Sequence, residues 1–92
     1  MLILTRGKGE SIEIGDGLTL TVIAIAKTRV GLLLATDDNL DEITLSMGES
    51  RDIGSSTAVK YLSQRGEKWA SLGFDAPKEV IIVRTEKVED RD

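Results

Sequence analysis

The chain has 92 residues with no Cys and no His, and its 16 acidic residues outnumber its 12 basic residues, for a formal net charge of -4. A chain this short supports one hydrophobic core. Without Cys and His it has no disulfide, no thiolate metal site and no imidazole base, so we expect no metal, no cofactor and no enzymatic activity. The acidic excess argues against unspecific nucleic-acid binding, so any RNA affinity must come from a local patch.

The first half of the chain predicts a series of short strands. These are residues 2–5, 11–14, 18–25, 30–35 and 42–46. The clearest is the third, because its side chains alternate with period two and many are β-branched. Gly15 and Gly17 precede it and favour a tight turn. Consecutive antiparallel strands with one core-facing side indicate an all-β fold.

The second half of the chain repeats the first. Residues 9–15, with the pattern Gly-Glu-Ser-x-x-Ile-Gly, return 39 residues further on as residues 48–54. Such agreement in a short chain indicates an internal duplication. We therefore predict a single domain that contains a first half-repeat at 1–46, a second at 47–84 and a charged tail at 85–92.

The position of the copy boundary depends on a second, weaker match. Residues 41–43 resemble residues 78–80, with the offset reduced to 37. This match assigns residues 43–46 to the last strand of the first copy, because residues 78–84 form the last strand of the second.

Residues 55–66 leave two structures open. They would suit a short helix, with a serine as N-cap and Gly66 as the C-terminal stop. The repeat favours a strand instead, because Leu20 and Val22 fall on Val59 and Tyr61 at the offset of 39 residues.

No apolar run approaches the roughly 20 residues that cross a bilayer. Residues 1–6 are too short for the apolar segment of a signal peptide. We therefore expect a cytoplasmic protein with no membrane contact.

Three motifs have simple structural interpretations. Residues 37–41 place three oxygen-bearing side chains at alternate positions, as in a calcium loop, but Glu42 stands where that loop needs glycine. Residues 7–11 lack the spacing of a phosphate-binding loop and predict a turn. Trp69, among small residues, is expected to pack in the core or at an edge rather than stack on a base.

Two arginines are candidates for nucleic-acid contacts. Arg6 and Arg84 each end an apolar strand. An exposed guanidinium at such a position could reach a phosphate or the edge of a guanine. Either residue alone would be an ordinary solvated arginine, so the case for nucleic-acid binding depends on the motifs around them.

Those motifs resemble the CsrA/RsmA carbon storage regulators. The first block is Met-Leu-Ile-Leu-Thr-Arg at 1–6 followed by Gly-Glu-x-Ile-x-Ile-Gly-Asp at 9–16, and the second is Leu-Gly-x-x-Ala-Pro-Lys-Glu-Val-x-Ile-x-Arg at 72–84. The resemblance implies five-stranded subunits that intertwine as a homodimer and bind GGA-containing hairpin loops in messenger RNA leaders. Each RNA site of that family combines the first strand of one subunit with the last strand of the other.

Carried over to this chain, the resemblance implies first-strand RNA contacts at Leu4, Thr5 and Arg6 and last-strand contacts at Val83 and Arg84. It implies messenger RNA, and small regulatory RNA with GGA loops, as partners, and a possible protein antagonist. The family usually has a second arginine directly after the position of Arg6, where this chain has glycine.

The repeat and the resemblance together predict a fused dimer in one chain, with the CsrA-type all-β fold and a pseudo-two-fold repeat. Such a chain is a monomer. We predict a single RNA site, because residues 43–46, as the last strand of copy one, leave copy two without a first strand.

Two alternatives remain open from the sequence. The first is a protein-interaction or antagonist module of the same fold that has lost RNA affinity, which the net charge and the missing second arginine favour. The second is one ordinary subunit with an insertion from residue 37 to about residue 66 that contains the helix, and this form would be a homodimer with two RNA sites.

Overall fold

The computed structural model describes residues 1–54 and 56–85, and in these ranges all regular secondary structure is β. The strands are β1 (Leu2–Gly7), β2 (Ser11–Ile14), β3 (Leu18–Ile25), β4 (Arg29–Ala35), β5 (Leu40–Ser46), β6 (Ser50–Gly54), β7 (Thr57–Arg65), β8 (Trp69–Asp75) and β9 (Ile82–Thr85). The predicted all-β class is confirmed. Most of the predicted charged tail lies outside the described residues.

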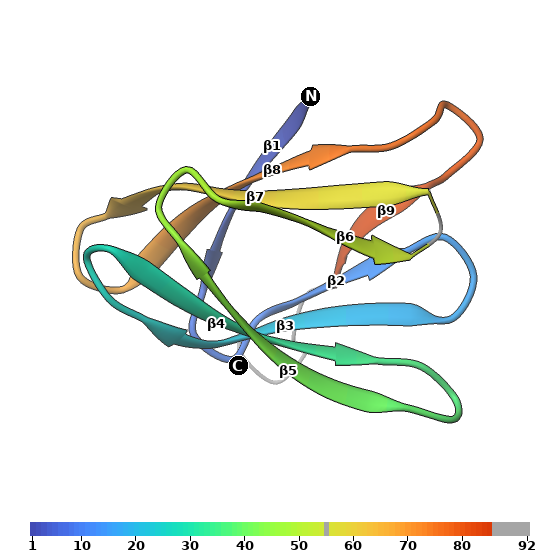
Figure 1. The fold of residues 1–92 in the computed structure, drawn as a ribbon, viewed down its shortest axis with the longest axis horizontal. Helices are drawn as coiled ribbons and strands as arrows, with labels where there is room; N and C mark the ends of the chain where they lie inside the picture. The colour runs from blue at the N-terminus through green and yellow to red at the C-terminus, as the bar shows by residue number, and fades with distance from the viewer. Residues whose placement is uncertain (55, 86–92) are drawn as a thin grey trace, which may run out of the picture.

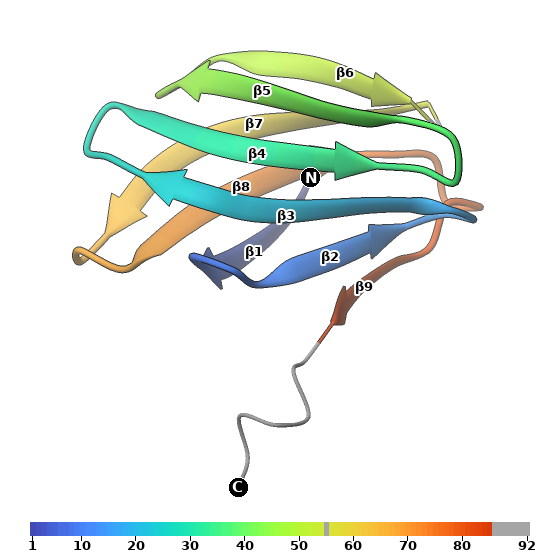
Figure 2. The same cartoon turned by 90° about the horizontal axis from the view of Figure 1, so that it is seen from below.

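The strands form two antiparallel sheets that face each other (Figures 1 and 2). The four-stranded sheet has the order β1-β8-β7-β6, and the five-stranded sheet has the order β5-β4-β3-β2-β9. The chain changes sheet after β1, after β5 and after β8. The first strand therefore pairs with the second half of the chain and the last strand pairs with the first half, which is the arrangement of an intertwined dimer within one chain.

Residues 57–65 form β7, so the predicted strand is confirmed and the helix is wrong. Val59 and Tyr61 point inward and are fully buried, like Leu20 and Val22 in β3. Because β5, β6 and β7 pair within the two sheets, residues 37–66 are not a helical insertion, and no described helix could span a membrane.

Tyr61 joins the two sheets at one end of the core. Its ring is fully buried, and its hydroxyl donates a hydrogen bond of 2.9 Å to the backbone carbonyl oxygen of Ala26. Ala26 follows β3 in the five-stranded sheet, so this bond connects the two layers. Burial raises the pKa of the Tyr61 hydroxyl.

Replacing Tyr61 by Phe should therefore lower the free energy of unfolding by about 1 kcal/mol, because the carbonyl oxygen of Ala26 loses its donor. The neutral hydroxyl is favoured in the folded state, so its contribution is complete below pH about 10 and is lost as the pH rises further. Urea unfolding of both proteins across this range tests both statements. A Tyr61→Phe variant that loses stability at high pH as steeply as the wild type would contradict the second one.

The internal duplication is visible in the hydrogen bonds of two equivalent turns. In the first turn, the amide of Gly9 donates to the carbonyl oxygen of Val22 at 2.7 Å and the amide of Val22 to that of Glu10 at 3.1 Å. In the second turn, the amide of Gly48 donates to Tyr61 at 2.7 Å and the amide of Tyr61 to Glu49 at 3.2 Å. Every atom pair is displaced by the same 39 residues.

The glutamates of the two turns also act alike. The side-chain Oε1 of Glu10 accepts the amide of Gly7 at 2.8 Å, and Oε1 of Glu49 accepts the amide of Ser46 at 2.9 Å. Gly7 ends β1 and Ser46 ends β5. The two strands therefore occupy equivalent places.

The strand pairing gives the same equivalence. β1 lies beside β8, with Arg6 opposite Ala70, and β5 lies beside β4, with Leu45 opposite Val30. Residues 43–46 thus correspond to a first strand, and their predicted role as the last strand of copy one is wrong. The weaker match at an offset of 37 was misleading, because residues 78–80 precede the strand that pairs with β2.

We propose on this basis that the first copy covers residues 1–39 and the second begins at Leu40. The second copy then has all five of its strands, β5 to β9. The first copy lacks its last strand, since β4 is followed directly by β5. This is why one sheet has five strands and the other has four.

Candidate nucleic-acid interface

β1 and β9 are edge strands on the same side of the sandwich. β1 is the outer strand of the four-stranded sheet and β9 that of the five-stranded sheet, so each has one backbone edge without a neighbouring strand (Figure 2). A cavity of about 210 Å³ at the start of both strands is lined by Leu2 on one side and Ile82 on the other. The fold thus brings the starts of β1 and β9, the first and last described strands, to the same cavity.

The side chain of Arg84 projects from the inner face of β9. Arg84 lies opposite Ile12 in the register of β9 and β2, and Ile12 is fully buried. Directly opposite residues of an antiparallel pair point to the same face of the sheet. Arg84 itself is exposed, and β9 is an edge strand of its sheet.

Arg6 also projects inward, but it is buried with 6% of its surface exposed. Its Nε donates to the carbonyl oxygen of Thr5 at 3.0 Å and lies 3.6 Å from Oε1 of Glu10. At the offset of 39 residues Arg6 corresponds to Leu45, which is fully buried. The expectation of an exposed Arg6 guanidinium is therefore wrong, and the cause is that this position of the repeat faces the core.

The remaining predicted residues lie on the same two strands. Leu4 is half-buried and packs against the core, whereas Thr5 is exposed on the outer side of β1. Val83 is 48% exposed and lies opposite Glu13. The five predicted residues therefore lie on two edge strands of different sheets on the same side of the sandwich, and the two arginines both project from inner faces.

The equivalent edge on the other side of the molecule is different. There β5 replaces β1, and Asp41 and Glu42 stand at the positions of Leu2 and Ile3. No described strand lies beyond β6, whereas β9 lies beyond β2. This second edge therefore lacks both a last strand and an arginine at the position of Arg6.

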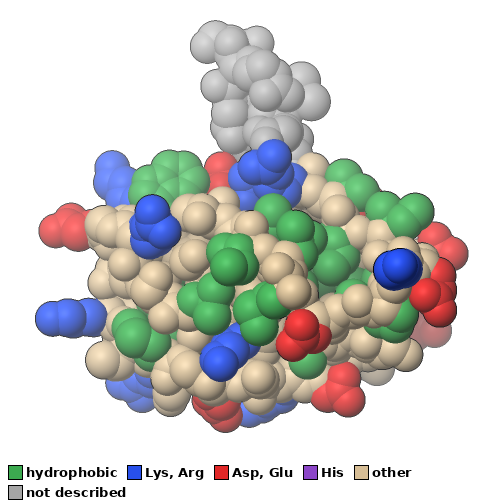
Figure 3. Space-filling model, turned by 90° about the horizontal axis from the view of Figure 1, so that it is seen from above, with side chains coloured by type: hydrophobic (Ala, Val, Ile, Leu, Met, Phe, Trp, Pro, Cys, Tyr) green, Lys and Arg blue, Asp and Glu red, His purple; other side chains and the backbone are tan. Residues whose placement is uncertain are grey.

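Trp69 packs at an edge, which is one of the two positions expected from the sequence. Its side chain is 44% exposed and packs on Gly7 rather than in the core. Figure 3, viewed from above Figure 1, shows apolar side chains in the middle of this side of the molecule, with both basic and acidic side chains among and around them. The exposed apolar residues near β1 include Met1 and Ile3, with 63% and 57% exposed.

The fold defines a small all-β protein of the intertwined type within one chain, with its first and last described strands at neighbouring sheet edges. A family model described as the CsrA global regulator protein family matches residues 1–41. The translational regulator CsrA of Exiguobacterium sp. (strain ATCC BAA-1283 / AT1b) is 37% identical over 71 residues, which cover 71% of this chain and 95% of the relative. No solved structure matches.

The chain belongs to the CsrA family. The resemblance stated from the sequence is thereby confirmed, and a family of global regulators agrees with the prediction that the chain is not an enzyme.

Proposed function

We propose that the chain binds GGA-containing loops of messenger RNA through one composite edge formed by β1 and β9, and regulates translation in this way. The observation that carries the proposal is the side-by-side position of these two edge strands, which come from opposite ends of the chain. Their unpaired backbone edges offer donors and acceptors to splayed bases, and arginine supplies a charge for phosphate or guanine.

The five residues of this edge have different roles in the proposal. Leu4, Thr5 and Val83 present backbone and side-chain surface to the bases. Arg84 supplies the exposed charge. Arg6 is a positioning residue, because its buried side chain contacts the carbonyl oxygen of Thr5 and the carboxylate of Glu10 and so holds the end of β1.

Titration of a GGA hairpin tests this function. The control is the same hairpin with the loop GGA changed to CCA, and each is measured at two salt concentrations. Binding through two or three phosphates should weaken roughly ten-fold between about 50 mM and about 200 mM salt. Equal affinity for both hairpins, or no binding to either, would contradict the proposal.

We further propose that the protein acts as a monomer with one RNA site. Both sheets already combine strands from the two halves of one chain, and among the described residues the second edge has no last strand. Native mass spectrometry should show the mass of a single chain, and one bound hairpin at saturation. Two hairpins for each chain, or a dimer as the main species, would count against this assignment.

A protein-interaction or antagonist function is the second candidate. The burial of Arg6 favours this second function, because the edge then has one exposed positive charge fewer. The net charge of -4 also favours it, because it weakens the attraction of RNA. Failure of the hairpin titration with a folded protein would favour this function over RNA binding.

A further inference from the structure

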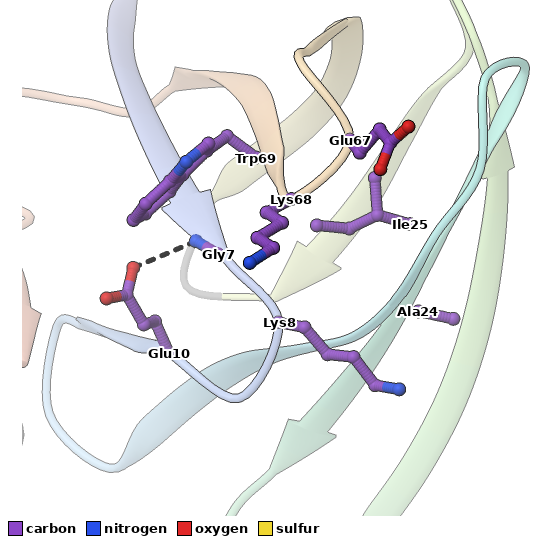
Figure 4. Close-up of a pocket in the computed structure, with 8 residues that line it drawn as sticks. All are labelled: Gly7, Lys8, Glu10, Ala24, Ile25, Glu67, Lys68 and Trp69. Carbon is purple, nitrogen blue, oxygen red and sulfur yellow. Dashed lines mark hydrogen bonds between the residues drawn. The ribbon is translucent and has the colours of Figure 1, made fainter.

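A cavity of about 530 Å³ adjoins the proposed RNA edge where β1 ends. It lies between the turn after β1 and the turn that joins β7 to β8. Figure 4 shows Trp69 on one side of this space and Ala24 and Ile25 on the other, with the side chain of Lys68 between them and that of Lys8 extending past the space on the side of Ala24. Gly7, which directly follows Arg6, is part of the lining.

The indole of Trp69 is held over Gly7. The two residues are opposite each other in the register of β1 and β8. A Cβ atom on Gly7 would lie 3.0 Å from Cζ3 and 3.2 Å from Cε3 of the indole. Glycine at this position therefore leaves room for the ring, in the place where the family usually has a second arginine. With 44% of the residue exposed, the indole remains accessible to a ligand.

The charges around the cavity suit a nucleotide. Lys8 and Lys68 supply two ammonium groups. Of the two carboxylates in the lining, Glu10 already accepts the amide of Gly7 at 2.8 Å and lies 3.6 Å from Nε of Arg6. Glu67 is the other, and it lies beside Ile25 (Figure 4). Aromatic rings with nearby cations are the usual platform for unpaired bases.

We propose that this cavity binds an unpaired nucleotide that flanks the GGA motif, with its base stacked on Trp69 and its phosphates near Lys8 and Lys68. The inference rests on the proposed function and extends the same site, because an RNA strand that follows β1 to Arg6 next reaches Gly7 and Lys8. Trp69 thereby supplies stacking where the family usually has a second guanidinium.

Two matched sets of hairpins test the proposal. In one set a single unpaired nucleotide flanks the loop GGA on the 5′ or the 3′ side, and in the other an abasic linker takes its place. The wild type should bind one of the two nucleotide-containing hairpins at least about five-fold more tightly than its abasic counterpart, with quenching of the fluorescence of Trp69, which is the only Trp.

The variants Trp69→Ala and Trp69→Phe identify the residue. Trp69→Ala should bind the nucleotide-containing hairpin and its abasic counterpart with equal affinity. Trp69→Phe should keep part of the difference in affinity between them. Leu40→Ala, on β5 with 67% of Leu40 exposed, is the matched control and should behave like the wild type. Circular dichroism of each variant verifies that it is folded.

The outcomes separate the two proposals. Equal binding of nucleotide and abasic hairpins by the wild type would overturn the stacking site and leave the proposed function standing. So would an equal loss of affinity for both hairpins in folded Trp69→Ala. No binding of any hairpin by the wild type would overturn both.

Discussion

An Arg84→Ala variant is expected to bind a GGA hairpin about 5- to 150-fold more weakly than the wild type, which corresponds to about 1 to 3 kcal/mol. Arg84 is the exposed arginine of β9. It lies opposite the buried Ile12, so its side chain leaves the inner face of its sheet, on the side of the sandwich where β1 also lies. The stability of the protein should change little, since an exposed side chain at an edge contributes few buried contacts. Fluorescence anisotropy with a labelled hairpin measures the affinity.

Arg51→Ala is the matched control for this variant. Arg51 is an exposed arginine of β6, at the opposite edge of the four-stranded sheet from β1, and it lies 3.9 Å from a carboxylate oxygen of Glu49. The substitution Arg51→Ala removes the same positive charge as Arg84→Ala, but from a different edge of the molecule. If both variants lost affinity equally, the loss would reflect net charge alone and Arg84 would not form part of a specific site.

An Arg6→Ala variant is expected to lose roughly 2 kcal/mol of unfolding free energy, because truncation of a buried side chain leaves a cavity and removes its polar contacts. These contacts include those of Nε with the carbonyl oxygen of Thr5 and with Glu10. Arg6→Leu should recover most of this loss, because the equivalent residue of the second copy is the fully buried Leu45. Chemical denaturation of the three proteins gives the comparison.

The same pair of variants separates positioning from direct RNA contact. If Arg6 acts only by filling the buried space at the end of β1, as Leu45 does in the second half of the chain, Arg6→Leu should bind the hairpin almost as tightly as the wild type, provided that it is as stable. A stable Arg6→Leu protein that loses as much affinity as Arg84→Ala would show that the guanidinium itself contacts RNA.

Much of the fold could be predicted from the sequence because it is encoded locally. Alternation of apolar and polar side chains marks β3, and glycine turns mark the ends of β1 and β2. The repeat extended this information to residues 57–65, where local preference left helix and strand equally open. Matching residues of the two copies can differ in type, as Val22 and Tyr61 do, but they share a buried position that faces the core.

The partner of each strand could not be predicted in the same way. Residues 40–46 form a strand under either assignment, and their correspondence to β1 is visible only in the structure, in their pairing with β4 and in the matching hydrogen bonds of Glu10 and Glu49. The single-site prediction remains, but its reason changes. The second edge has its first strand and lacks its last one.

The environment of the site residues also depends on tertiary structure. An arginine at the end of an apolar strand looks exposed, yet Arg6 continues the inward side of β1 and is buried. Conversely, Trp69 has the composition of a packing residue and is half-exposed, because it is the first residue of its strand and lies over a glycine. Neither result follows from local sequence.

Amide chemical shifts of the labelled protein during titration with a GGA hairpin test the central claim most directly. The account predicts that the affected amides cluster on β1 and β9, including those of Leu4, Thr5, Val83 and Arg84, while those of β5 and β6 stay unchanged. Shifts concentrated on β5 and β6, or no shifts on β1 and β9 at saturating RNA, would contradict it.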